Sequence, residues 1–130
     1  MAEFIDIAVC GAHMRGLPLN HQLTELQAIF IKATKTAKGY RLFNVPEKVP
    51  PRPGMVRDRS SEAALELEVW SMPLENFGAF MVQITSPLCI GTVFLEDGSS
   101  VYGFLCENDP LKGAEEITVH GGWKNYLAAR

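Results

Sequence analysis

Hydrophobic and polar positions alternate along several stretches of the chain, and this alternation predicts β-strands. The segment Phe4–Cys10 (FIDIAVC) has a polar position at Asp6 and then becomes continuously apolar, as a strand entering a core does. The segment Ala64–Met72 alternates leucine and valine with Glu66 and Glu68. Such a strand packs one face on a core and turns its glutamates to water.

Two stretches predict β-hairpins. The first starts at Ile29 as IFIKATKTA, rich in β-branched residues, turns at KGY and continues as YRLFNV. The second pairs Gly91–Leu95 with Val101–Cys106 across EDGSS, whose Asp-Gly pair is a strong hairpin signal. Four of the eight prolines lie between these hairpins, within Pro46–Pro53. Proline does not fit the interior of a sheet or helix, so an exposed extended loop running to Ser61 is expected.

Short helices are expected at three places. Asn20 can cap a helix over Gln22–Ala28, and Pro73 suits the first turn of a helix over Leu74–Gln83, where apolar residues recur at helical spacing. The C-terminal GGWKNYLAAR predicts another helix after a Gly-Gly break. About six or seven short strands with two or three short helices predict an α+β fold with a largely antiparallel, curved or closed sheet.

Composition limits the classes of partner. The chain has 130 residues, about one domain (1–130), and 47% of them are hydrophobic and 21% charged, as in folded globular proteins. Its net charge of −3 and scattered lysines and arginines provide no basic stripe for nucleic acid or for an anionic membrane. No stretch has the roughly 20 apolar residues that span a bilayer, and the acidic N-terminus lacks the basic start of a secretory signal. A cytoplasmic location is therefore expected.

The stretch after the first strand, CGAHMRGLPLNHQL (residues 10–23), is the candidate site. A glycine-rich turn after a buried strand can present backbone N–H groups to a small carboxylate. Gly11, Ala12 and His13 would form the floor of such a pocket, and Asn20 and Gln22 its polar walls. The amides of about residues 12–17 are expected to face into the pocket.

His13 is the candidate acid or base, because imidazole titrates near neutral pH. The alternative is that His13 caps backbone groups in a structural turn. As a loop residue it is expected to be exposed, and His21 and His120 are expected to be exposed and without a role. No cysteine lies near another in a metal-binding or redox spacing, so Cys10, Cys89 and Cys106 are expected to be reduced, and neither a metal nor a cofactor is indicated. The pairs Glu66/Glu68 and Glu115/Glu116 are interpreted as solvated faces.

Four blocks of the sequence resemble the C-terminal domain of allophanate hydrolases. They are GAHMRGLPLNHQL (11–23), LEVWSMPLENFGAF (67–80), IGTVFLEDGSSVYGFLCE (90–107) and GGWKNYLA (121–128). The resemblance covers nearly the whole chain, and the blocks occur in the same order as in the family. It implies a fold similar to gamma-glutamyl cyclotransferases, a small mixed β-barrel with flanking helices.

The resemblance also implies a chemistry. In allophanate hydrolases an amidase domain releases ammonia from allophanate, and the C-terminal domain then helps convert N-carboxycarbamate to ammonia and carbon dioxide. The histidine of the family motif G-x-H-x-x-G-x-P-L-N falls on His13, which becomes the catalytic candidate. The substrate-binding candidates come from the same loop: Gly11, Ala12, Met14, Arg15, Gly16, Leu17, Asn20 and Gln22.

Two further functions stay open. The chain carries no Ser-Ser-Lys amidase machinery, so a separate amidase subunit is an expected partner beside the small carboxylate substrate. A chain that docks on such an amidase could instead be a non-catalytic carboxylate-binding or assembly module. A gamma-glutamyl-type cyclotransferase is the third alternative, although no carboxylate of the region LENFGAFMVQI can be placed as the glutamate base of those enzymes.

Overall fold

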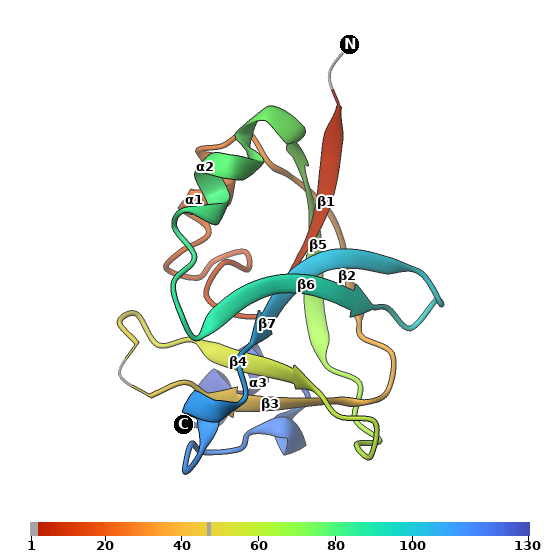
Figure 1. Ribbon diagram of the computed structural model, residues 1–130, viewed down its shortest axis with the longest axis vertical. Coiled ribbons are helices and arrows are strands. Elements are labelled where there is room, and N and C mark those ends of the chain that lie inside the picture. Colours follow the sequence, from red (N-terminus) through yellow and green to blue (C-terminus); the bar gives the residue numbers. More distant parts are fainter. Residues whose placement is uncertain (1–2, 47) are drawn as a thin grey trace.

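A curved five-stranded sheet forms the main layer of the protein. The structure, a computed structural model, describes residues 3–46 and 48–130. The sheet has the strand order β2-β5-β1-β7-β6, in which only β1 and β7 are parallel (Figure 1). Its strands are β1 (Phe4–Val9), β2 (Ile29–Lys35), β5 (Glu66–Pro73), β6 (Leu88–Phe94) and β7 (Ser100–Cys106).

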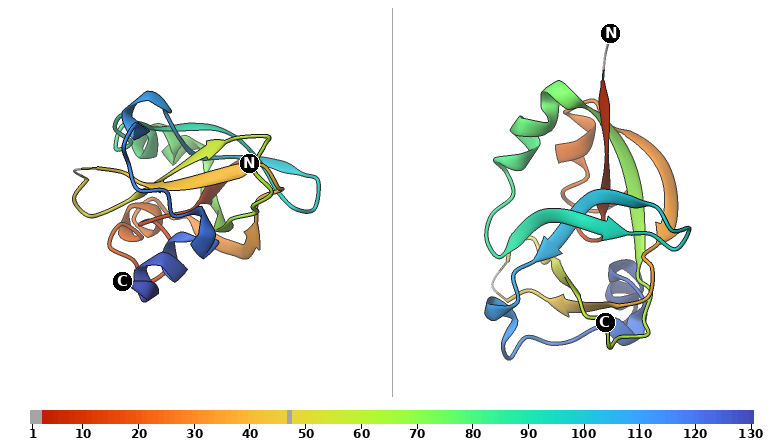
Figure 2. Two further views of the ribbon diagram at one scale, coloured as in Figure 1. Left: turned by 90° about the horizontal axis from the view of Figure 1, so that it is seen from below. Right: turned by 45° about the vertical axis from the view of Figure 1, so that its right-hand side comes forward.

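A second, two-stranded sheet and short helices complete the fold. The strands β3 (Tyr40–Asn44) and β4 (Pro53–Arg57) pair antiparallel, and β4 packs on β7. Helices α1 (His21–Thr24) and α2 (Phe77–Met81) lie at the end where the chain enters β1, whereas α3 (Trp123–Ala129) lies at the opposite end (Figures 1 and 2). The remaining turns are 3-10 helices η1 (Leu74–Asn76), η2 (Asp109–Leu111) and η3 (Thr118–His120).

The predicted α+β fold is confirmed, and so is its largely antiparallel pairing. The strands predicted from residues 4, 64 and 91 onward are present, and the β6–β7 hairpin turns at the predicted Asp-Gly. The sheet does not close into the predicted barrel. Among the described residues, an isolated bridge between Thr36 and Leu95 is all that joins the ends of the two edge strands β2 and β6, so no continuous ladder closes the sheet there.

The hairpin predicted from Ile29 to Val45 is wrong. Its two strands belong to different sheets, because β2 pairs with β5 and β3 pairs with β4. Alternation identifies a strand but not its partner. The connection through Gly39, at φ 108°, carries the chain from one sheet to the other.

The proline-rich loop is shorter than predicted. Strand β4 begins at Pro53, and residues 53–55 are buried. Proline is tolerated as the first residue of a strand, so Pro53 starts β4 rather than preventing it. Residue 47 of this predicted loop lies outside the described residues.

The predicted helices are short. Helix α1 spans one turn rather than Gln22–Ala28, and Asn20 makes no side-chain cap to it. The helix predicted over Leu74–Gln83 is η1 followed by α2, and the C-terminal helix is present as α3. Within the described residues, no helix is long and apolar enough to cross a bilayer.

Candidate functional site

The loop after β1 folds into consecutive tight turns. The amide of Met14 donates to the carbonyl of Gly11 at 3.0 Å, and that of Leu17 donates to Met14 at 3.1 Å. The amide of Leu19 reaches back to the carbonyl of Ala12 at 2.9 Å. The chain reverses at Gly16, whose φ of 80° favours a residue without a Cβ. These bonds fix the loop as a rigid unit against the core.

His13 is buried in this loop, contrary to the expected exposed position. Its side chain is stacked on Phe104, with ring centroids 4.8 Å apart, and meets the edge of Phe80 at 5.6 Å. The residue is only 5% exposed. Gln22 Oε1 lies 2.7 Å from His13 Nε2, and Asn20 Nδ2 donates to the His13 carbonyl at 2.8 Å. Two residues predicted as pocket walls therefore hold the histidine in place.

This environment keeps the His13 imidazole neutral near pH 7. Burial lowers the pKa of His13 to about 4, and the positive charge of Arg52 lowers the pKa further, against the opposing effect of the Gln22 hydrogen bond. Because the Gln22 oxygen is an acceptor, the neutral ring carries its proton on Nε2. Nδ1 then has a free lone pair and makes no hydrogen bond to a described residue. The resting ring can accept a proton but holds none ready to donate from Nδ1.

A small cavity of about 10 Å³ lies beside His13. It is lined by residues from four segments: Cys10, Gly11, Ala12, His13, Arg52, Pro53, Leu88 and Phe104. Among these lining residues, Arg52 is the one that is partly exposed. No carboxylate is among these lining residues, and no described residue supplies the glutamate base that cyclotransferase chemistry would need there.

The predicted row of free amides is only partly present. Among the amides of residues 12–17, those of Met14 and Leu17 bond within the loop and that of Arg15 donates to the Glu68 carboxylate at 2.9 Å. The amides of Ala12 and His13 donate to no described group, and both residues line the cavity. The turn geometry of the loop, which the sequence pattern does not specify, determines which amides remain available.

Glu68 is buried, so the prediction that it faces water is wrong. Its side chain is 4% exposed and accepts four hydrogen bonds: from the Arg15 amide, Arg15 Nε at 3.2 Å, Trp70 Nε1 at 3.1 Å and Lys124 Nζ at 3.4 Å. Burial alone would raise the pKa of Glu68, but these donors outweigh it and hold the pKa below its ordinary value. The carboxylate therefore ties the His13 loop to β5 and to α3.

The remaining predicted site residues are divided between two sides of the loop. Gly11 and Ala12 line the His13 cavity, whereas Met14 and Arg15 line a separate hollow beside Glu68 and Lys124. Gly16 and Leu17 form the turn that follows. Arg15 stacks its guanidinium 3.7 Å from the centre of the Phe30 ring. The loop thus brings only part of the predicted set to one place.

The three cysteines are free in the described structure. Cys10 lines the cavity, but burial raises the pKa of its thiol to about 12, so the thiol is protonated at neutral pH. Cys106 is also protonated, because burial raises its pKa to about 11. Neither thiol is poised as a nucleophile. Among the described residues, no group of three or more histidine, cysteine or acidic side chains could hold a metal ion.

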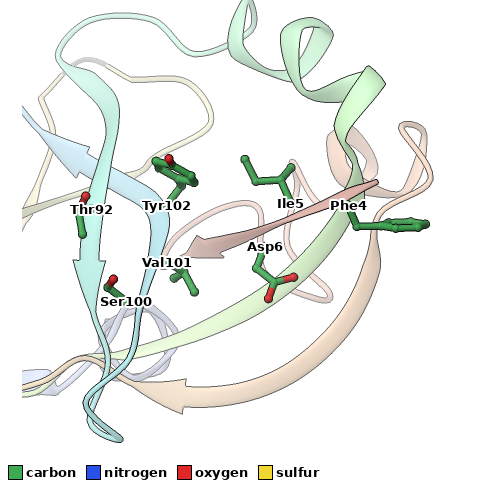
Figure 3. Close-up of a pocket in the computed structure, with 7 residues that line it drawn as sticks. All are labelled: Phe4, Ile5, Asp6, Thr92, Ser100, Val101 and Tyr102. Carbon is green, nitrogen blue, oxygen red and sulfur yellow. The ribbon is translucent and has the colours of Figure 1, made fainter. Parts of the chain in front are cut away.

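A larger cleft of about 500 Å³ lies elsewhere, between the N-terminal ends of β1 and β7. Figure 3 shows Phe4, Ile5 and Asp6 on one side of it and Ser100, Val101 and Tyr102 on the other. The two strands pair only at Ile7–Tyr102 and Ala8–Gly103, so they separate before these positions. None of the residues predicted for the site lines this cleft.

Arg52 is the residue that sequence reasoning missed. It lies in the proline-rich segment that was predicted to be an exposed extended loop, about forty positions after His13. Gly11 explains how the two segments meet, because a Cβ on Gly11 would lie only 2.4 Å from Pro53 Cδ. A cation held between Pro51 and Pro53 in a stiff segment is the signal that could have indicated a fixed role.

The fold is of the gamma-glutamyl cyclotransferase-like type. A gamma-glutamyl cyclotransferase structure superposes with a TM-score of 0.58 at 14% identity over 88% of this chain and 70% of its own, a likeness of fold alone. The chain belongs to the allophanate hydrolase C-terminal domain family, which residues 5–128 match.

Individual relatives support the same family. The urea amidolyase of Saccharomyces cerevisiae is 44% identical over 127 residues, which cover 95% of this chain and 7% of the yeast protein. The chain therefore spans a small part of that relative's length. The structure of Kluyveromyces lactis allophanate hydrolase superposes with a TM-score of 0.93 at 37% identity, covering 98% of this chain and 21% of its own. A uropathogenic E. coli-specific protein superposes with a TM-score of 0.90 at 34% identity, covering 98% of both chains.

Proposed function

We propose that this chain accelerates the decarboxylation of N-carboxycarbamate, or of a similar small N-carboxy compound, with His13 as acid and base. The observation that carries the proposal is the His13 ring, which Gln22 fixes at Nε2 while Nδ1 stays unbonded beside a cavity. Family membership supplies the substrate class, since the matching domain occurs in allophanate hydrolase and urea amidolyase. Burial, the Gln22 contact to the ring and the Asn20 hydrogen bond to the His13 carbonyl hold the residue in one position, so it is preorganised.

The proposed reaction begins with a charge effect. His13 is neutral in the empty site, because burial lowers its pKa to about 4. N-carboxycarbamate carries two carboxylates, and negative charge within a few ångströms of the ring favours the imidazolium. Binding of the dianion therefore lets Nδ1 take up a proton from water. Substrate binding thus produces the acid, protonated His13, which is absent from the empty site.

The chemical step then balances with one proton. Nδ1–H donates this proton to the substrate nitrogen as a C–N bond breaks and its electron pair stays on nitrogen. The departing carboxylate becomes carbon dioxide. The carbamate that remains takes a second proton from water and decomposes to ammonia and a second carbon dioxide. His13 returns to its neutral state. General acid catalysis of this kind contributes on the order of 10²–10⁴-fold in rate.

The substrate has to come from another catalyst. Because the chain spans 7% of the length of the yeast urea amidolyase, we propose that an amidase active on allophanate supplies N-carboxycarbamate to it. A non-catalytic carboxylate-binding subunit of such an amidase is the alternative. The small volume of the cavity and the neutral resting state of His13 are compatible with binding alone, and turnover separates the two.

The test couples the purified chain to an amidase that releases ammonia from allophanate, and follows carbon dioxide release. The chain should raise the rate of carbon dioxide release above that of the amidase alone. His13→Asn keeps a hydrogen-bonding group but cannot titrate, so it should lose most of this acceleration. His21→Asn is the matched control, because His21 is exposed and bonds only to the Pro18 carbonyl through its ring.

Stability has to be measured on the same samples. If the wild-type chain and His13→Asn release carbon dioxide at the same rate, the catalytic role is wrong and the binding-module alternative is favoured. If His13→Asn is inactive only because it is unfolded at the assay temperature, circular dichroism will detect the loss of structure. His13→Gln, which can place an amide near the same position, then serves as the second variant.

A further inference from the structure

Arg52 carries an unsatisfied polar atom beside His13. Its Nε is buried and makes no hydrogen bond to any described residue. A buried N–H without an acceptor costs about 1–3 kcal/mol, more for a charged group. Folded proteins rarely keep such an atom without a use. An acceptor that arrives with a ligand would satisfy it.

The main chain around Arg52 is fixed, although its side chain makes no hydrogen bond or ion pair to a described residue. Pro51 and Pro53 restrict the backbone on both sides, and the Arg52 carbonyl accepts a hydrogen bond from the Val45 amide at 3.0 Å. Pro53 packs directly against Gly11 at the base of the His13 loop. The fixed main chain therefore keeps Arg52 beside the cavity, and its side chain can change rotamer there.

We propose that Arg52 binds a carboxylate of the molecule that occupies the His13 cavity, and that it restricts this site to dianions. The proposal rests on the proposed function for its substrate class. A planar guanidinium matches a carboxylate with two parallel N–H···O bonds. The cavity of about 10 Å³ holds about one water molecule, so a larger ligand has to displace a lining group. Arg52 is the lining residue with solvent access, and it moves to meet the carboxylate.

Charge explains the preference for dianions. In the empty site Arg52 contributes one positive charge and the neutral His13 none. A monoanion neutralises Arg52 and leaves no negative charge to favour the imidazolium. A dianion neutralises Arg52 and leaves one negative charge, which protonation of His13 then balances. Arg52 thus makes protonation of His13 depend on the second carboxylate of the ligand.

The experiment uses malonate and malonamate as a matched pair of probes. Malonate replaces the central N–H of N-carboxycarbamate with CH₂ and carries both charges, whereas malonamate has nearly the same shape and one charge. Calorimetry should show that Arg52→Gln weakens malonate binding about 10–100-fold, the loss expected for charge-assisted hydrogen bonds. Arg52→Lys keeps the positive charge but lacks the planar guanidinium, so its malonate affinity should lie between those of wild type and Arg52→Gln. Arg59→Gln removes an exposed arginine outside the cavity and should bind malonate within about twofold of wild type.

A second readout follows the His13 ring. Malonate should raise the pKa of His13, measured from its ring carbon and nitrogen chemical shifts, whereas malonamate should leave that pKa close to its value in the free protein. In Arg52→Gln the difference between the two probes should shrink. The melting temperature of Arg52→Gln should equal or exceed that of wild type, because the substitution removes an unsatisfied buried group; a purely structural arginine would give a fall.

The outcomes separate the two proposals. Equal malonate affinity in wild type and Arg52→Gln, or no malonate binding by wild type, would overturn the role of Arg52. Equal affinity of wild type for malonate and malonamate would overturn the restriction to dianions. Arg52-dependent binding of malonate without any acceleration of carbon dioxide release would support Arg52 as the carboxylate-binding residue and reject the decarboxylation.

Discussion

The buried neutral His13 should make the fold sensitive to mild acid. The pKa of His13 falls from an ordinary 6.5 to about 4 in the folded protein, chiefly through burial. In the unfolded chain the ring titrates near its ordinary value. Between these two pKa values the unfolded state binds a proton that the folded state does not, so the free energy of unfolding falls as the pH falls. Below about pH 4 both states are protonated and the effect no longer grows.

The size of the effect follows from the two pKa values. A difference of about 2.5 pKa units corresponds to about 3 kcal/mol, since one unit is worth 1.36 kcal/mol. The loss should reach about 1 kcal/mol at pH 6, about 2 kcal/mol at pH 5 and about 3 kcal/mol at pH 4. For a domain of this size such a loss is a large share of the total stability of about 5–15 kcal/mol.

Urea denaturation at pH 7.5, 6, 5 and 4.5 measures this directly. The wild-type chain and His21→Asn should lose stability in parallel, because His21→Asn keeps the buried His13 ring. His13→Asn should be less stable at pH 7.5, since it loses the packing against Phe104, but its stability should fall by about 2 kcal/mol less than that of wild type between pH 7.5 and 5. Parallel pH curves for wild type and His13→Asn would refute the assignment of a buried neutral histidine.

Two further substitutions test the scaffold of the site. Glu68→Gln removes the carboxylate oxygen that accepts hydrogen bonds from the half-exposed cations Arg15 and Lys124, and it should lower the free energy of unfolding by about 2–3 kcal/mol in urea denaturation. Glu66→Gln, two positions away and exposed, is the control and should change that free energy by less than about 0.5 kcal/mol. A Glu68→Gln cost as small as that of Glu66→Gln would mean that the buried carboxylate does not anchor the loop. Gly11→Ala forces a Cβ to within 2.4 Å of Pro53 Cδ. It should lower the free energy of unfolding by about 1–3 kcal/mol and weaken malonate binding. Gly78→Ala is its control, because a Cβ at Gly78 meets nothing within 4 Å. Wild-type malonate affinity in Gly11→Ala would show that the contact with Pro53 does not position the cavity.

The predictable part of the fold is the part that local pattern determines. Alternation identified β1 and β5, and the Asp-Gly turn identified the β6–β7 hairpin. The partners of β2 and β3 could not be predicted in this way, since alternation is the same whichever strand lies alongside. Strand β4 was hidden because Pro53 was read as a breaker, although proline is compatible with the first position of a strand.

The candidate site was predicted in part for the same reason. The glycine-rich loop and His13 were found because they are contiguous in the sequence. Glu68 was misread because a period of two suggests a wet face and cannot show that Arg15 and Lys124 lie across from it. Arg52 was missed because only the contact of Pro53 with Gly11, which is long-range, brings it to the histidine.

The charge state of the cavity connects these residues in one argument. A buried imidazole with a pKa of about 4 is unprotonated at neutral pH and so cannot act as an acid, and the adjacent cation disfavours the protonated ring further. A site built in this way would be inactive toward water and toward neutral molecules, because nothing in it favours the protonated ring. In the proposed mechanism, a ligand with two negative charges would reverse both effects at once, by pairing with Arg52 and by stabilising the imidazolium. The features that make His13 unsuitable as an acid in the empty protein would therefore make proton transfer conditional on the presence of a dianionic substrate.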